Sequence, residues 1–276
     1  MRRLLIPLLL TLAALGSPRA AQIALYDDPS WVSTGTAAAS ANSLDALLTT
    51  LGHHTSTFSG LSGSAFSTAL AGADLVVFPE LLNFGQLASV LQPGALVALG
   101  DFVAAGGGLI AAGPYAYRLL NSIFYPTCSA VGQCFAGTGS AGASFQDAAV
   151  AAGTPYAGAP GTLTDPPGQN DAINHYAFLP PGALDLYHDP YGSTTVLTAP
   201  IGAGKFGYLA WGFGGSVPNG SLDGGWSTLL GIMVEDVAAV PAPPSALLLI
   251  GLLPLLWAGS WLSASDRRRT AGAAGR

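Results

Sequence analysis

The chain has 276 residues, half of them hydrophobic and only 9% charged, with a formal net charge of −6 at pH 7. Between Gln22 and Ala239 the balance is more acidic, with 2 basic against 14 acidic residues and hence a charge of −12. A surface of this sign repels phosphate backbones, which excludes nucleic acid as a partner. It suits solubility outside the cell.

The N-terminus has the pattern of a secretory signal peptide. Two arginines at positions 2 and 3 precede an apolar run from Leu4 to Leu15, and small residues follow at Ala20 and Ala21. The apolar run is too short to span a membrane. We therefore expect residues 1–21 to be removed, with cleavage after Ala20 or Ala21, and the mature body to begin at about residue 22.

The first half of that body alternates predicted strands and helices. Apolar runs predict strands over residues 22–26, 75–78 and 109–112, and residues 54–58 can form a further strand. Helical spacing predicts helices over residues 37–51, 64–70 and 86–103, the last interrupted by Pro93 and Gly94. Such alternation calls for parallel strands joined by right-handed crossovers. The expected fold is an open, mostly parallel α/β sheet with helices on both faces.

The second half is less regular. From about residue 115 to 165 the pattern dissolves into Gly, Ala, Ser and Pro, which predicts an irregular insertion in a domain spanning 22–239. Strands are expected over 179–187, 194–198 and 206–211, with a closing amphipathic helix over 226–237.

The only two cysteines, Cys128 and Cys134, lie within the insertion with five residues between them. In an exported chain an isolated pair forms one disulfide most simply. A metal or redox site, or a nucleophilic Cys128, are the alternatives. The spacing is not that of a Cys-x-x-Cys motif, and no histidine lies nearby in sequence.

Three segments carry a resemblance to a known fold family: DLVVFPEL from Asp74, FVAAGGGLIAAG from Phe102 and APIGAGKFGYLAWGF from Ala199. This layout resembles the class I glutamine amidotransferase-like superfamily, which implies a flavodoxin-like α/β sandwich. In active members a cysteine sits on a sharp turn after a central strand, and a histidine and an acid complete the triad.

The two corresponding turns of this chain hold no such nucleophile. They read Leu82-Asn83-Phe84 and Pro114-Tyr115-Ala116-Tyr117. Neither supplies a Cys or Ser flanked by the glycines that a nucleophile elbow needs. We therefore expect no amidotransferase or peptidase activity of that kind, and no cofactor.

Three acidic residues follow predicted strands, at the edge where open α/β sheets bind ligands. Glu80 follows the strand 75–78, and Asp27 and Asp28 follow the strand 22–26. Each can be an ordinary exposed acid at a strand end. If the three converge, they would form an acidic pocket that could hold Ca²⁺ through oxygen ligands.

Two histidines are candidates for general base chemistry. His175 and His188 each lie next to aromatic residues and near an aspartate. The alternative is a half-buried histidine hydrogen-bonded in a loop. Five aromatic residues, which could form a sugar-stacking surface or pack in the core, are Tyr115, Tyr117, Tyr125, Trp211 and Trp226.

The C-terminal segment 240–276 has three consecutive parts. A proline cluster is followed by an uncharged apolar run over 246–262, whose 17 residues span roughly 25 Å as a helix, and then by Arg267, Arg268 and Arg269. This order predicts a transmembrane helix with its arginines on the cytoplasmic side.

The same three-part order resembles the PEP-CTERM sorting signal, which exosortase-type membrane peptidases process in Gram-negative bacteria. The motif stands here as Val240, Pro241, Ala242, Pro243, Pro244 and Ser245. Ala242 replaces the glutamate of the Val-Pro-Glu-Pro family motif, so the segment is either cleaved or remains as an anchor.

Together these observations predict an exported, non-catalytic surface or extracellular-matrix protein. The implied partners are signal peptidase, an exosortase-like peptidase, the inner membrane before processing and extracellular polysaccharide. The alternatives are a surface hydrolase that uses a histidine–acid pair, and a calcium- or glycan-binding module.

Overall fold

The computed structural model describes residues 20–36, 39–125, 135–139, 142–165, 171–175, 179–214 and 223–238. The strands are β1 (Gln22–Tyr26), β2 (His54–Phe58), β3 (Leu75–Phe78), β4 (Gly108–Ala112), β5 (Phe135–Gly139), β6 (Ser144–Gln146), β7 (Thr162–Leu163), β8 (Ala172–His175), β9 (Leu184–His188), β10 (Thr194–Ile201) and β11 (Gly204–Leu209). The helices are α2 (Ser40–Thr50), α3 (Gly63–Leu70), η1 (Asn83–Gly85), α4 (Leu87–Val90), α5 (Pro93–Ala104), α6 (Ala116–Phe124), α7 (Ala148–Ala151), η3 (Pro155–Gly158) and α8 (Trp226–Val237).

The first part of the sheet is parallel, as the alternation of strands and helices predicts. Its strand order is β2-β1-β3-β4-β11, and Phe78, Ala111 and Tyr208 lie side by side on β3, β4 and β11. Every residue of β3 and β4 is buried. Helices cover both faces of these strands, so apolar side chains pack on either side. We call these five strands the parallel half.

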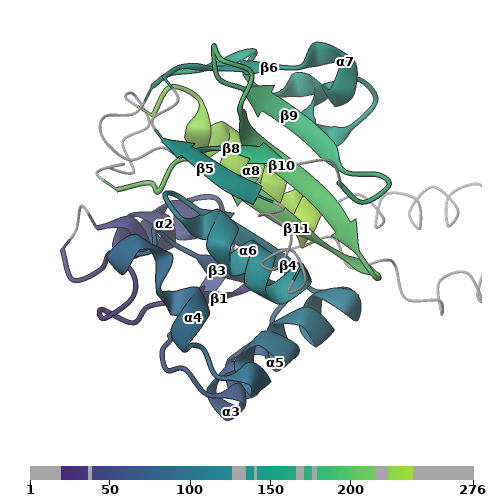
Figure 1. Cartoon of the computed structure of the whole chain (residues 1–276). Coiled ribbons are helices and arrows are strands. Elements are labelled where there is room, and N and C mark those ends of the chain that lie inside the picture. The colour runs from purple at the N-terminus through teal and green to yellow at the C-terminus, as the bar shows by residue number, and fades with distance from the viewer. Residues whose placement is uncertain are drawn as a thin grey trace, which may run out of the picture. The chain divides into compact units, whose positions relative to one another are not determined.

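The sheet continues beyond β11 with antiparallel strands in the order β10-β9-β6-β7, while β8 pairs with β10 and β5. We call this part the antiparallel half (Figure 1). Strands expected over 194–198 and 206–211 are present with shifted ends, and the strand expected over 179–187 covers only Leu184–His188. The complete sheet is therefore mixed. A short turn at Gly202 joins β10 to β11 and reverses the chain, so these two strands run antiparallel.

Helices pack on both faces of the parallel half. The Phe206 ring stacks on Phe124 of α6, whereas a side chain at Gly207 would meet Met233 of α8. Because successive strand residues face opposite sides, α6 and α8 lie on opposite faces. α5 packs with α3 and α6, and the end of α2 at Leu51 lies beside α8.

The stretch predicted to be irregular, residues 115–165, contains regular elements. It holds α6, which packs on β4 and α5, and the short strands β5, β6 and β7. The apolar residues of α6 recur at helical spacing, with Ala116, Leu119 and Leu120 buried. The surrounding Gly, Ala and Ser obscure that spacing in the sequence.

Several predicted features lie outside the described residues. They are almost all of the signal peptide, the Cys128–Cys134 pair, the sorting motif, the apolar run over 246–262 and the three arginines. Among the residues that are described, no helix combines the length and apolar character needed to cross a membrane.

Candidate functional site at the carboxyl edge

The parallel strands point in one direction, so the segments that follow β1, β3, β4 and β11 meet at one edge of the sheet, which we call the carboxyl edge. Asp27 follows β1, Glu80 follows β3, Tyr115 follows β4 and Trp211 follows β11. Open α/β sheets bind ligands at this edge. It is therefore the first place to look for function.

The part of the edge between β1 and β3 is closed by the protein itself. The segments after these strands pair through an isolated bridge between Val32 and Leu81. The Ser33 amide donates to the Glu80 carbonyl at 3.1 Å, and the Leu82 amide donates to the Trp31 carbonyl at 2.8 Å. Val32 is fully buried. A ligand at this edge must therefore lie toward β4 and β11.

Glu80 lies against the ends of both of those strands. A Cβ atom on Gly212 would be 2.8 Å from the Glu80 Cβ, and one on Gly113 would be 3.2 Å from it. The Glu80 amide donates to the Ser40 hydroxyl at 2.9 Å, and this hydroxyl donates to the Gly212 carbonyl. The two glycines thus leave room for the Glu80 side chain above β4 and β11.

The Glu80 carboxyl group is in an environment that disfavours its charge. Its Oε2 atom is buried and has no hydrogen-bond partner, and burial raises its pKa. A partly buried acid with a raised pKa at a ligand-binding edge is a typical functional-site candidate. The sequence identifies this position, and its partial burial follows from the fold.

The other two acids do not join Glu80. Both carboxylate oxygens of Asp28 accept backbone amides, from Ser30 at 3.0 Å and Gly60 at 3.4 Å, so this side chain shapes its own turn. Asp27 Oδ1 is buried without a partner. Among the described residues, no three His, Cys, Asp or Glu side chains are arranged to hold a metal ion. The described residues therefore do not show the convergence of Asp27, Asp28 and Glu80 that a calcium site would need.

A sharp turn joins β4 to α6. Gly113 has φ of 82°, and Tyr115 has φ of 64° and ψ of 0°, in the left-handed region that non-glycine residues rarely adopt. This is a strand–turn–helix arrangement like that of a nucleophile elbow, with a tyrosine in the position where that motif carries a serine or cysteine. Asn83 (φ 53°) and Phe213 (φ 59°) follow the two neighbouring strands, β3 and β11.

A cluster of four side chains forms around the elbow; we call it the Arg118 cluster, and its members are Tyr115, Tyr117, Arg118 and Asp171. The Arg118 Cζ lies 5.6 Å from the Tyr115 ring centre and 5.9 Å from the Tyr117 ring centre. Its Nε donates to the Tyr117 hydroxyl at 3.4 Å. Arg118 is exposed, whereas Tyr117 is buried.

Asp171 is the buried acid of the cluster. Its carboxylate accepts the Gly139 amide at 2.9 Å and the Tyr115 amide at 3.4 Å. Burial raises the pKa of Asp171, while these two amides and the nearby Arg118 charge act to lower it. Asp171 therefore fixes the backbone of the elbow and partly balances Arg118.

The histidine candidates do not lie near Glu80. His188 Nε2 is 3.7 Å from Asp185 Oδ1 on the same strand, β9, which is beyond hydrogen-bonding distance. β9 lies four strands from β3, about 19 Å at the usual strand spacing. The backbone of His175 lies in β8, and its side chain is outside the described residues.

The aromatic residues considered as a sugar-stacking surface lie mostly inside. Trp211 is 3% exposed and packs on Phe213 and on the fully buried Trp226, with ring centres 4.5 and 5.9 Å away. Tyr117 is buried as well. Core packing is thus the correct interpretation for these three. Among the described residues, the exposed aromatic side chains are instead Tyr191 and Phe145, which lie in the antiparallel half.

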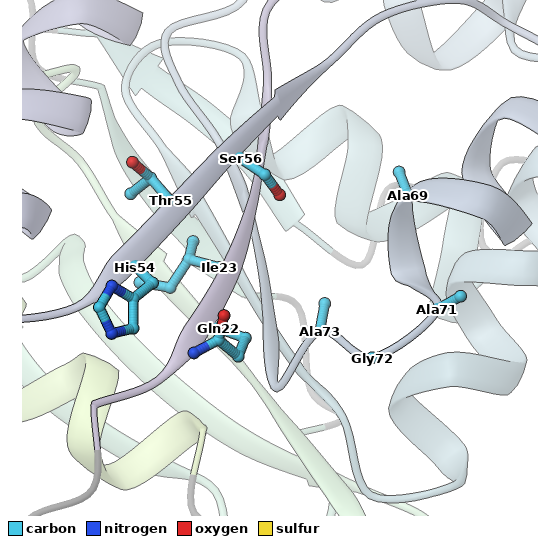
Figure 2. A pocket seen from close by; sticks show the side chains of 9 residues that line it. All are labelled: Gln22, Ile23, His54, Thr55, Ser56, Ala69, Ala71, Gly72 and Ala73. Carbon is cyan, nitrogen blue, oxygen red and sulfur yellow. The ribbon is translucent and has the colours of Figure 1, made fainter.

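A shallow pocket of about 150 Å³ lies at the opposite end of the strands (Figure 2). Gln22, His54, Thr55 and Ser56 line it from the start of β1 and β2. Ala69 at the end of α3 and the small residues 71–73, which join α3 to β3, line the other side. His54 is its only ionisable side chain, so its lining offers no acid–base pair.

Comparisons with known proteins show the fold and no family. No family model and no curated protein matches the chain. A ThuA-like protein from Bacteroides uniformis ATCC 8492 is 13% identical, with a TM-score of 0.51 over 80% of this chain and 90% of that one. At this identity the likeness concerns the fold alone.

Two further solved structures are similar at lower scores. A cytoplasmic protein from Salmonella typhimurium is 10% identical, with a TM-score of 0.48 over 80% of this chain and 98% of that one. The exo-β-1,4-mannosidase Op5Man5 from Opitutaceae bacterium strain TAV5 is 14% identical, with a TM-score of 0.47 over 78% of this chain. The chain spans 36% of that enzyme's length.

Proposed function

We propose that the chain is an exported surface or extracellular-matrix protein that acts by binding and not by catalysis. The observation that carries this proposal is the elbow between β4 and α6, where Tyr115 occupies the left-handed position. The turn carries a phenol, with its ring beside Arg118, in place of the serine or cysteine of a nucleophile elbow. The chain thus has the strained turn but lacks the cysteine or serine that would act there as a nucleophile.

The body is, in this proposal, a flavodoxin-like domain of the glutamine amidotransferase-like class without its nucleophile. The strand order β2-β1-β3-β4-β11 supports this assignment, because flavodoxin-like sheets have the order 2-1-3-4-5. The likeness of the fold to a ThuA-like protein is consistent with it. The antiparallel half is an addition to that core.

The two ends of the chain are the basis for proposing that the protein is exported. The basic and apolar N-terminus is read by signal peptidase, and the segment 240–276 by an exosortase-like peptidase. The precursor is held in the inner membrane of a Gram-negative cell through residues 246–262. After processing, the body reaches the cell surface or matrix, where extracellular polysaccharide is the expected partner.

Export is tested by expressing the full chain in a Gram-negative host with and without its exosortase gene. We expect surface or released protein in the first case and inner-membrane protein in the second. The variant Ala242→Glu restores the family motif, so it should be processed at least as completely as the wild type. An identical distribution in both hosts would contradict the proposed sorting.

The absence of catalysis is tested with glutamine, ester and peptide substrates. The wild type and Tyr115→Phe should give the same background rate. A hydrolase that uses His188 is the competing function, and the 3.7 Å separation of His188 and Asp185 does not favour it. Turnover that His188→Gln or Glu80→Gln abolishes would establish an enzyme and overturn the proposal.

A further inference from the structure

The residue before β1 is already held by the fold. Ala21 is 6% exposed, and its carbonyl accepts the His54 amide at 3.0 Å. Its own amide donates to His53 Nδ1 at 3.3 Å. Ala21 therefore supplies the first link between β1 and β2, whose starts lie side by side at Gln22 and His54 (Figure 2).

Gln22 is bonded to a different neighbour, the segment before β3. Its amide donates to Asp74 Oδ2 at 2.9 Å, and its carbonyl accepts the Asp74 amide at 2.8 Å. These bonds do not replace those of Ala21. A chain that began at Gln22 would leave the His54 amide without its acceptor and His53 Nδ1 without its donor, at the cost of two hydrogen bonds.

The position of the Ala21 nitrogen also suits a positive charge. Burial lowers the pKa of His53, against the nearby charge of Glu235 on α8 and together with His54, so the ring is neutral at pH 7 and offers Nδ1 as an acceptor. Glu235 and Asp74 bring carboxylates to this end of the strands. An α-ammonium group at Ala21 would keep the bond to His53 and strengthen it through its charge.

The sequence before Ala21 favours the same starting residue. Signal peptidase sites place small residues one and three positions before the cut, in the pattern Ala-x-Ala. A cut after Ala20 places Ala20 and the compact, uncharged Pro18 there. A cut after Ala21 places Arg19 three positions before the cut, where a long charged side chain does not fit the pattern.

From these observations we infer that the signal peptide is removed between Ala20 and Ala21, and that the new α-ammonium group is seated on His53 as the fixed start of the sheet. The step is a hydrolysis that consumes one water and breaks the Ala20–Ala21 peptide C–N bond. The water oxygen completes the Ala20 carboxylate, and its two hydrogens convert the Ala21 N–H into an ammonium group. This inference rests on the proposed export and specifies its first processing step.

The cleavage position is tested by expressing the full chain in a Gram-negative host and sequencing the N-terminus of the exported protein by mass spectrometry. We expect it to begin with Ala21, followed by Gln22 and Ile23. A chain that begins with Gln22 would overturn the cleavage position and leave export standing. A cytosolic chain that still begins with Met1 would contradict the proposed export itself.

The seat on His53 is tested by moving the cut. The double variant Arg19→Ala with Ala20→Lys places Ala-Lys-Ala before Gln22, so cleavage should shift by one residue. Both substitutions leave with the signal peptide, so the mature chain lacks Ala21 and is otherwise unchanged. Because two hydrogen bonds are lost, we expect it to melt about 4 °C lower than the wild type. Equal melting temperatures would overturn the seat.

Two histidine variants separate the ring from the backbone. His53→Ala removes the acceptor of the Ala21 nitrogen, and His54→Ala, at an exposed position, is the matched control because it keeps its backbone amide. In His53→Ala, removing Ala21 should lower the melting temperature by only about half as much as in the wild type, whereas His54→Ala should leave the difference unchanged. A difference that His53→Ala does not reduce would show that the ring does not hold the N-terminus, and would overturn the seat.

Discussion

The two halves of the sheet differ in where they carry backbone strain. In the described residues, the three non-glycine residues with positive φ follow β3, β4 and β11 of the parallel half. Glu80 Oε2, buried without a partner, lies at the same edge. In the antiparallel half the turn between β9 and β10 is well satisfied, since Asp189 accepts the Tyr191 and Ser193 amides at 2.9 and 2.7 Å.

This difference indicates a division of roles between the two halves of the sheet. Strain and buried unpaired acids cost free energy and persist where the surrounding structure enforces them, typically at functional sites. The parallel half has the fully buried strands that can enforce them. The antiparallel half widens the sheet and places Phe145 and Tyr191 on its surface. The predictions below test this division.

The largest effect is expected from the core of the parallel half. Ile110, at the centre of β4, is fully buried, so Ile110→Ala should lower the free energy of unfolding by about 2–5 kcal/mol. Phe145→Ala removes a larger side chain from β6, but one that is 48% exposed, and should cost less than about 1 kcal/mol. Urea denaturation measures both. If the two variants lose the same free energy of unfolding, the buried position in the parallel half contributes no more to stability than the exposed position in the antiparallel half.

The boundary between the halves contains a buried polar network. Lys205 at the start of β11 pairs with Asp236 of α8 at 2.6 Å, and the Tyr156 hydroxyl of η3 donates to the same carboxylate at 3.3 Å. Lys205→Met leaves Asp236 without its cation and should cost about 1–3 kcal/mol in urea denaturation. Lys205→Arg keeps the charge and should cost less. If the two variants are equally stable, the charge pair does not join the halves.

A smaller effect concerns Glu80 and depends on pH. Burial raises its pKa above the ordinary value of 4.5, so the folded state favours the protonated form. The associated stability is present below the unfolded pKa and is lost as pH rises through the folded pKa. Glu80→Gln cannot ionise, so it should gain stability relative to the wild type as pH rises through this range.

The control for that measurement is Thr68→Gln, which places the same side chain at an exposed, non-ionisable position on α3. Its stability should follow the wild-type curve across the same pH range. Parallel curves for Glu80→Gln and the wild type, measured by urea denaturation from about pH 4 to about pH 8, would show that Glu80 is not held in a charge-disfavouring site.

The smallest effect is expected from calcium. Because the described acids form no cluster of three, adding or chelating Ca²⁺ should change the melting temperature by less than about 1 °C. Differential scanning calorimetry measures this. A rise of several degrees that Glu80→Gln or Asp27→Asn abolishes would restore the calcium-binding alternative.

Local pattern predicts the parallel half well and the antiparallel half poorly. The bounds of β1, β2 and β3 and of α8 agree with the structure. β1 and β3 are apolar runs and α8 is an amphipathic repeat, each with a clear end, whereas β2 is a short, mostly polar run that contains two threonines. Strand direction is not encoded in such a run. For that reason the late strands could be located, while their antiparallel pairing could not.

The candidate site, too, could be predicted only in part from the local sequence pattern. Glu80 is identifiable as an acid after a buried strand, but its burial depends on Gly113 and Gly212, which become its neighbours only when β4 and β11 pair. The left-handed turn at Tyr115 is equally hidden, because tyrosine rarely adopts it. The Gly-Pro dipeptide before it is the one local signal of a turn.

The central claim, export of the body between two processed ends, is tested most directly by mass spectrometry of the protein recovered from its native cells. We predict a surface or released species that starts at Ala21 or Gln22, ends near the proline cluster after residue 239, and carries a Cys128–Cys134 disulfide. An intact chain from Met1 to Arg276 in the cytosol, with both thiols reduced, would contradict the claim.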